Sequence, residues 1–275
     1  MLGNRAEALV FPKINLNVAK NNNTDAAVLQ FALNLEYLEA EYYAYAVSGQ
    51  GIETFGVNVT GAGTAGTTTV KGSPMVPFAT AAFAQYATEI AADEISHVKF
   101  LRAALEGTGE RPVARPAINL KESFAAAAQA AGLGAGFDPF ANEVNFLIGA
   151  FVFEDVGVTA YKGASPLISN KEFLEAAAGI LAVEAYHAGI IRTLLFQLGG
   201  TTQAATKAIS DLRDAAAGSE KDQPVIISGQ ANLVPSDGNA IAYSRTTREV
   251  LNIVYLQANA SSGGFFPAGL NGEIK

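Results

Sequence analysis

The stretches DEISH at 93–97 and VEAYH at 183–187 contain the only two histidines of the chain, each three residues after a glutamate. A spacing of three places two side chains on the same face of a helix. Acidic residues occupy only 26 of 275 positions, so composition alone rarely gives both histidines this neighbour. The two stretches therefore predict two helices, one presenting Glu94 with His97 and the other Glu184 with His187.

Both pairs lie on apolar helix faces, which is where the core of a bundle forms. Ile90 and Leu101 share the face of the first pair, and Ile180 and Ile191 share that of the second. A buried carboxylate is costly unless it is paired or coordinates a cation, so both pairs are predicted to face something positive. The alternative, a salt bridge on the helix surface, would make these faces polar.

Two further glutamates repeat a second pattern. Glu36 and Glu154 each lie on an apolar stripe, and each is followed seven residues later by a tyrosine, Tyr43 or Tyr161. The chain thus contains one arrangement twice: a helix with Glu and Tyr, then a helix with Glu-x-x-His. Glu39 competes with Glu36, because its neighbours are nearly as apolar, and the tyrosine spacing favours Glu36.

Capping residues, first-turn prolines and terminal glycines divide the chain into helices. A Gly- and Thr-rich segment at 48–73 cannot be helical and is expected to form a long loop or a short hairpin. Long helices are expected at 25–47, 77–106, 138–163 and 169–198, and shorter ones at 122–131, 201–217 and 244–257.

These elements predict an all-α fold, an antiparallel four-helix bundle in which each long helix crosses the domain. One domain is expected for residues 1–275, with its bundle core at about 24–200 and a C-terminal extension at about 201–275. Four carboxylates and two imidazoles in the core carry a charge of about −4, which two divalent cations would neutralise. Iron or manganese suits such ligands, and zinc is compatible. The predicted ligands are Glu36, Glu94, His97, Glu154, Glu184 and His187.

Several other polar side chains have two interpretations. Asp155 is either a further acid ligand or a helix-surface residue, and periodicity does not separate the two. Tyr43 and Tyr161 either lie near the metals, as hydrogen-bond donors or radical sites, or only pack in the core. Glu41, which shares its face with two tyrosines and a serine, is expected to be solvated.

Composition excludes several classes of protein. The absence of cysteine rules out disulfides, thiolate metal sites and iron–sulfur clusters. A net charge of −8 without clustered basic residues argues against nucleic-acid binding. The apolar windows at 145–161 and 173–196 contain charged residues, so buried helices are expected there and no membrane span. Residues 1–20 lack the apolar stretch of a signal peptide, so an exported protein would have lost its leader.

The sequence resembles the plant desiccation-related proteins and their bacterial homologues, a branch of the ferritin-like superfamily. The resemblance rests on LNLEYLEAEYY at 33–43, DEISHVKFLRAAL at 93–105, FEDVGVTAYKGA at 153–164 and VEAYHAGIIRTLL at 183–195, supported by SRTTREVLNIVYL at 244–256 and GGFFPAGLNG at 263–272. It implies a ferritin-like fold with a di-metal site at the six residues above. It also implies that Asp93 hydrogen-bonds a ligand histidine, and that the protein is extracytoplasmic, with the cytoplasm as the alternative.

Two functions follow as hypotheses. The first is a di-metal oxidoreductase, ferroxidase-like or manganese-catalase-like, that acts on dioxygen, peroxide or ferrous iron in stress or desiccation protection. The second is a non-catalytic protector that sequesters metal or has a structural role. A homo-oligomer is compatible with both. A storage cage is not expected, because the Gly-rich insert and the long tail would have to fit on its shell.

Overall fold

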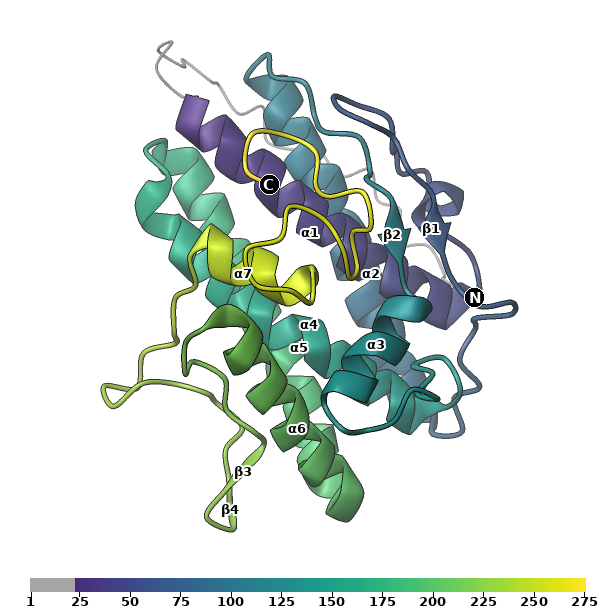
Figure 1. The fold of residues 1–275 in the computed structure, drawn as a ribbon. Coiled ribbons are helices and arrows are strands. Elements are labelled where there is room, and N and C mark those ends of the chain that lie inside the picture. Colours follow the sequence, from purple (N-terminus) through teal and green to yellow (C-terminus); the bar gives the residue numbers. More distant parts are fainter. Residues whose placement is uncertain (1–22) are drawn as a thin grey trace.

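Four long helices form the centre of the fold (Figure 1). They pack as two pairs, the first with the second and the third with the fourth. These helices are α1 (Asn23–Ser48), α2 (Ala81–Gly107), α4 (Glu143–Ala164) and α5 (Lys171–Leu198). The all-α bundle predicted from the sequence is confirmed, with α2 beginning four residues later than predicted.

The computed structural model describes residues 23–275. The expectation that the first 20 residues lack a signal peptide lies outside the described residues. Smaller elements connect or cover the long helices: η1 (Ile52–Phe55), β1 (Thr68–Thr69), β2 (Ile118–Asn119), α3 (Glu122–Ala130), η2 (Ser165–Leu167), α6 (Gly200–Ala217), β3 (Ile226–Ile227), β4 (Gln230–Ala231) and α7 (Thr247–Val254).

Helix α4 starts later than the sequence predicts. Asn142 caps it by accepting a hydrogen bond from the backbone N–H of Asn145. Asp138, the predicted cap, instead accepts from the N–H of Phe140 and from Lys71. The Asp138-Pro139 pair therefore forms a turn ahead of the helix.

Helix α5 shows a similar shift by one residue. Asn170 accepts the capping bonds from the N–H groups of Glu172 and Phe173. Ser169, the predicted cap, donates its hydroxyl to the buried carboxylate of Asp25 near the start of α1. This contact joins the start of α1 to the start of α5.

The Gly-rich segment after α1 forms a long loop along the bundle. Its strand β1 pairs in parallel with β2, which comes from the loop after α2. Arg115 from that second loop forms an ion pair with Glu41 on α1, and both side chains are buried. The prediction that Glu41 is solvated is therefore wrong, because the residues around it in α1 cannot show that a distant loop covers them.

The C-terminal extension packs on the bundle through two helices. Helix α6 contacts α4 and α5, and α7 contacts α4 and α6. Helix α7 begins with a capping box formed by Thr246 and Glu249 and is shorter than predicted. The segment after α7 lies over α1 (Figure 1), where the Asn34 side chain donates to the backbone carbonyl of Asn271.

Asp155 on α4 belongs to a buried cluster of charges. Its carboxylate accepts hydrogen bonds from Arg192 of α5 at 2.7 Å and from Arg213 of α6 at 3.1 Å. Arg213 also pairs with Asp222, which in turn pairs with Arg245 just before α7. These five side chains are at most 7% exposed. Asp155 is thus neither a further acid ligand nor a helix-surface residue. It is a buried anion that links the C-terminal extension to the bundle.

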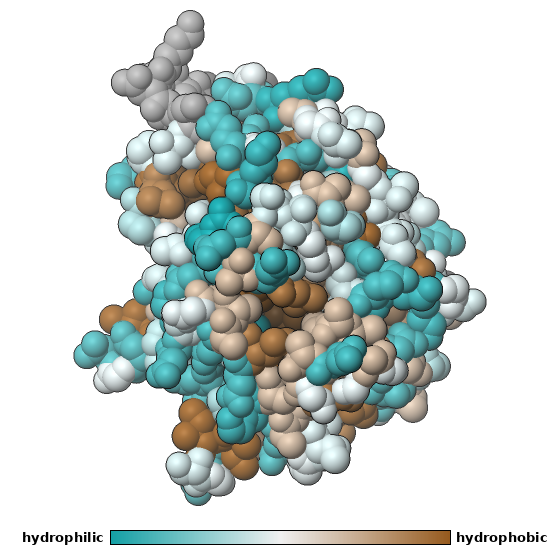
Figure 2. Space-filling view, in the orientation of Figure 1, coloured by the Kyte–Doolittle hydropathy of each residue, from teal (hydrophilic) through white to brown (hydrophobic). Residues whose placement is uncertain are grey.

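Hydrophobic side chains line the interior of the bundle, and some gather around a hollow on the face shown in Figure 2. Within the described residues, two helical segments are long and apolar enough to cross a membrane by length and composition alone. The first is α4 continued by η2, and the second is α5. The apolar window of the first is 78% buried inside the protein, and that of the second is 33% buried. The burial of α4 is that of a core helix in a bundle, as the sequence predicts.

Candidate metal centre

The six predicted ligands come from all four long helices and meet inside the bundle. Glu36 lies on α1, Glu94 and His97 on α2, Glu154 on α4, and Glu184 and His187 on α5. The four glutamates are at most 1% exposed, and the histidines are 8% and 3% exposed. These side chains share a helix face with Leu29, Leu33, Ile90, Leu147 and Ile180, so burial of the apolar stripes carries the polar groups inward.

The cluster divides into two groups that share one glutamate. In each group, one ligand atom from every member lies within 4.8 Å of the others. The first group contains Glu36, Glu94, His97 and Glu184, and the second contains Glu94, Glu154 and His187. Because Glu94 belongs to both groups, its carboxylate is placed to bridge two cations.

Each histidine points its Nδ1 atom at carboxylates of the cluster. His97 Nδ1 lies 3.3 Å from Glu36 Oε2, and His187 Nδ1 lies 3.0 Å from Glu94 Oε1. The centroids of the two rings are 6.2 Å apart. The rings therefore face one shared centre from α2 and α5.

Tyr43 and Tyr161 each hydrogen-bond a ligand glutamate on the helix opposite, at the oxygen that faces away from the centre. Tyr43 on α1 donates its hydroxyl to Glu154 Oε1 on α4, and Tyr161 on α4 donates to Glu36 Oε1 on α1. Each helix thus supplies one glutamate and orients the glutamate of the other. The seven-residue spacing seen in the sequence produces this exchange.

Asp93 lies behind His187. Its Oδ2 atom is 3.3 Å from His187 Nε2, on the opposite side of the ring from Nδ1. A carboxylate in this position orients the ring of a ligand histidine and leaves the other nitrogen free to bind a metal. In the part of the chain that the structure describes, only Nδ1 of His97 has ion-pair contacts with carboxylates, and the position before Glu184 in the repeated pattern is Val183.

Burial and mutual repulsion make the cluster a poor place for bare charges. Burial raises the pKa of Glu154 to about 8 and also raises those of Glu36 and Glu184. Burial lowers the pKa of a histidine, yet the facing carboxylates outweigh it and raise the pKa of His97 to about 11 and that of His187 to about 10. The cluster retains positive charge, which metal cations would supply in place of protons.

The unpaired atoms identify where cations would fit. Within the described residues 23–275, the atoms facing the centre have no hydrogen-bond partner, although each histidine lies within ion-pair distance of a carboxylate: Glu36 Oε2, both oxygens of Glu94, Glu154 Oε2, both oxygens of Glu184, and Nδ1 of each histidine. The other oxygens of Glu36 and Glu154 are bonded by the tyrosines. Buried polar atoms normally have partners, so orphans that all converge fit two cations well.

Glu39, the rival of Glu36, lies one turn further along α1. It is 6% exposed, and its carboxylate lies beside the cluster without belonging to either group. The structure thus places Glu36 among the candidate ligands. Periodicity gave both residues an apolar neighbourhood, and only the repeated tyrosine spacing distinguished them.

Comparisons with known proteins agree with this geometry. A family model described as a ferritin-like domain matches residues 24–197. The chain is 31% identical over 272 residues to the desiccation-related protein PCC13-62 of Craterostigma plantagineum, covering 91% of this chain and 84% of that protein. It is 28% identical over 277 residues to the ferritin-like catalase Nec2 of Nesocodon mauritianus, covering 92% and 85%. No solved structure matches the chain. The chain therefore belongs to the ferritin-like family, in the branch of the desiccation-related proteins.

Proposed function

We propose that the protein binds two metal ions, iron or manganese, between its four long helices and uses them to decompose peroxide. The observation that carries the proposal is the convergence of eight unpartnered ligand atoms in a buried centre with one shared glutamate. The relative whose name describes a catalase supports peroxide as the substrate, ahead of dioxygen and ferrous iron. A role in stress or desiccation protection fits the name of the other relative.

The side chains of the centre have separate tasks in this proposal. Glu94 would be shared by the two metals, His97 and His187 would hold one each, and the remaining glutamates would complete the two groups. The tyrosines and Asp93 hold ligands in place from outside, while the surrounding core excludes bulk water. Two redox-active metals supply electron exchange with peroxide, so that two molecules of hydrogen peroxide give two of water and one of dioxygen.

Glu94→Ala tests the proposal most directly, because this residue belongs to both groups. We expect the wild-type chain, after reconstitution with iron or manganese, to retain two metals and evolve dioxygen from hydrogen peroxide. The variant should lose most of its metal and its turnover. Glu89→Ala, which removes an exposed acid from the same helix, is the matched control and should change neither. Elemental analysis and an oxygen electrode give the two readouts.

The same experiment separates the alternative function. A chain that retains two metals in a Glu94-dependent manner but evolves no dioxygen would be a metal-sequestering protector. A wild-type chain that binds neither metal after reconstitution would contradict both functions. Location outside the cytoplasm remains a prediction from the family resemblance.

A further inference from the structure

The repeat that builds the centre is broken at one position. On α1, Glu39 stands three residues after Glu36 and four before Tyr43. The same position on α4, three after Glu154 and four before Tyr161, holds a glycine, Gly157. One half of the centre thus has an extra carboxylate where the other half has no side chain.

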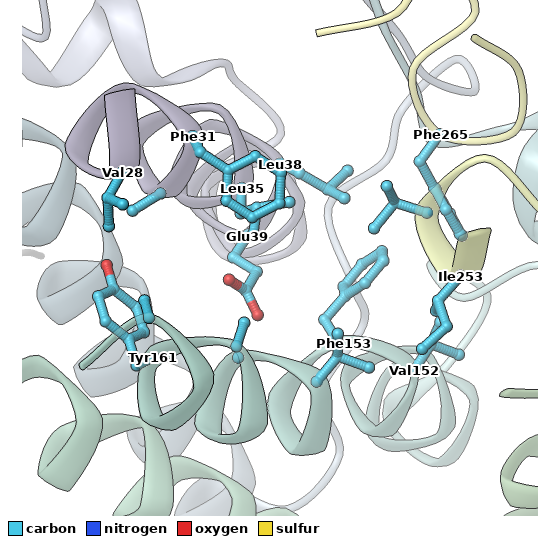
Figure 3. A pocket seen from close by; sticks show the side chains of 16 residues that line it. Val28, Phe31, Leu35, Leu38, Glu39, Val152, Phe153, Tyr161, Ile253 and Phe265 are labelled. Carbon is cyan, nitrogen blue, oxygen red and sulfur yellow. The ribbon is translucent and has the colours of Figure 1, made fainter. Parts of the chain in front are cut away.

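The glycine makes room for Glu184, and Glu39 lies at contact distance beside it. A Cβ atom at Gly157 would lie 3.5 Å from Glu39 Oε1 and would overlap Glu184 Oε2. Glu39 points from α1 across to α4 at this place (Figure 3). Among the described residues 23–275 it makes no hydrogen bond or ion pair, although it is only 6% exposed. An unpartnered carboxylate this deeply buried is costly unless another molecule meets it.

Glu39 lies in the middle of the lining of a hollow between α1 and α4 (Figure 3). The hollow is open to solvent, and about 40 Å³ of it can hold the centre of a water molecule. Phe31 and Leu35 line it from α1, Val156 from α4, and Ile253 and Phe265 from the C-terminal extension. Apart from Glu39 and the Tyr161 hydroxyl, its lining is apolar. The hollow therefore joins an apolar wall to the carboxyl group of Glu39, which lies close to Glu184 of the candidate centre.

The chemistry of this lining selects a class of ligand. A metal cation or another ion would lose its hydration along the apolar wall, so the passage disfavours charged species. Hydrogen peroxide alone would leave most of the wall without a partner. An uncharged molecule with an apolar body and a hydrogen-bond donor at one end matches both the wall and the carboxylate.

We propose that the hollow between α1 and α4 binds an uncharged organic molecule, its apolar body against the wall and its hydroxyl or hydroperoxyl head at Glu39. The assignment of a substrate rests on the proposed function, under which the members turned over are organic hydroperoxides. Two molecules of ROOH then give two of ROH and one of O₂, so no outside reductant is needed. Glu39 accepts the hydrogen bond of the head group and places the O–O bond beside the metals.

Binding can be measured without metals or turnover. Benzyl alcohol and toluene have the same body and differ in the donor head, and neither is a peroxide. Isothermal titration calorimetry of the chelator-treated chain should show binding of each. The ratio of the two dissociation constants should move by about fivefold against the alcohol in Glu39→Leu, which removes the acceptor, the worth of one net hydrogen bond.

Two alanines on helix surfaces provide matched variants. Ala160→Phe fills the proposed hollow, whereas Ala216→Phe fills a separate apolar hollow between α3, α4, α6 and α7. Both alanines are partly buried. We expect the affinity for toluene to fall at least about tenfold in the first variant and to stay unchanged in the second, one inserted ring being enough to occupy such a site. Ala164→Leu is the smaller substitute if Ala160→Phe does not fold.

Absence of binding, or binding abolished by Ala216→Phe and retained in Ala160→Phe, would overturn the proposal. An unchanged ratio of dissociation constants in Glu39→Leu would overturn the role of Glu39. The titrations use the chain stripped of metal. A negative titration would therefore contradict ligand binding in the hollow without contradicting metal binding at the centre. Failure of metal reconstitution, in turn, leaves the binding result intact.

Discussion

The side chains of the candidate centre have two positions. Some face the centre itself, and others contact these ligands from outside. Tyr43, Tyr161 and Asp93 each contact a ligand on the side away from the centre. Such contacts fix the orientation of a ligand before the metal arrives, which lowers the cost of binding. The strength of metal binding therefore depends on residues that touch no metal.

Asp93→Asn tests this dependence. Loss of the carboxylate behind His187 Nε2 should weaken metal binding about 10- to 100-fold, since the ring is no longer held by a charged partner. Competition with a chromophoric chelator measures the affinity. Glu89→Gln, an exposed acid one turn earlier on α2, should leave it unchanged. Equal affinities for Asp93→Asn and the control would show that Asp93 is only a surface residue.

Sequence patterns were informative at this scale where a residue lay in a repeated motif. The six candidate ligands stand in motifs that occur twice, so spacing brought them to attention, whereas Asp93 was suggested by the family resemblance. Glu41 and Asp155 lie in no such motif, and their partners are Arg115, Arg192 and Arg213, which come from distant segments. Local periodicity could not predict those pairs.

At the scale of helices, end positions were the least predictable feature. Asp138 and Ser169 have the chemistry of caps, but tertiary contacts with Lys71 and Asp25 engage them and neighbouring asparagines cap the helices. The helices themselves follow from apolar periodicity, and this pattern is the same whichever residue caps the first turn. The existence of each long helix was thus predictable and its first residue was not.

The contact between α4, α5 and α6 depends on Asp155, the anion shared by Arg192 and Arg213. Asp155→Ala should lower the free energy of unfolding by about 3–5 kcal/mol, because it leaves the buried guanidinium of Arg192 without a carboxylate and takes from Arg213 one of the two that it contacts. Chemical denaturation followed by circular dichroism measures this.

Asp211→Ala is the control for that change. It breaks an exposed pair with Lys207 on α6 and should cost no more than about 0.5 kcal/mol. If Asp155→Ala were as mild as the control, the cluster would contribute little to holding the extension.

For the whole molecule, the centre is a source of instability until it is filled. Burial raises the pKa of Glu154 to about 8, against 4.5 for a free glutamate, and raises the pKa values of Glu36 and Glu184. A raised pKa means that the folded chain binds more protons than the unfolded chain. That contribution to stability is complete below pH 4.5 and is lost as pH rises through the folded pKa.

We therefore expect the melting temperature of the chelator-treated protein to fall as the pH rises from about 5 to 8. Metal binding displaces the same protons, so the difference in melting temperature between the loaded and the chelated protein should grow over this range. Differential scanning calorimetry at several pH values measures both. Identical melting curves with and without chelator would argue that the centre holds no cation.

The exchange of tyrosines across the bundle has a consequence for how such a protein can be divided. The first half of the chain contributes Glu36, Glu94 and His97, yet it depends on Glu184 for its ligand group and on Tyr161 to steady Glu36. The second half depends in the same way on Glu94 and Tyr43. Neither half can assemble a complete ligand group alone, so a polypeptide of one half would need a second copy to hold a cation.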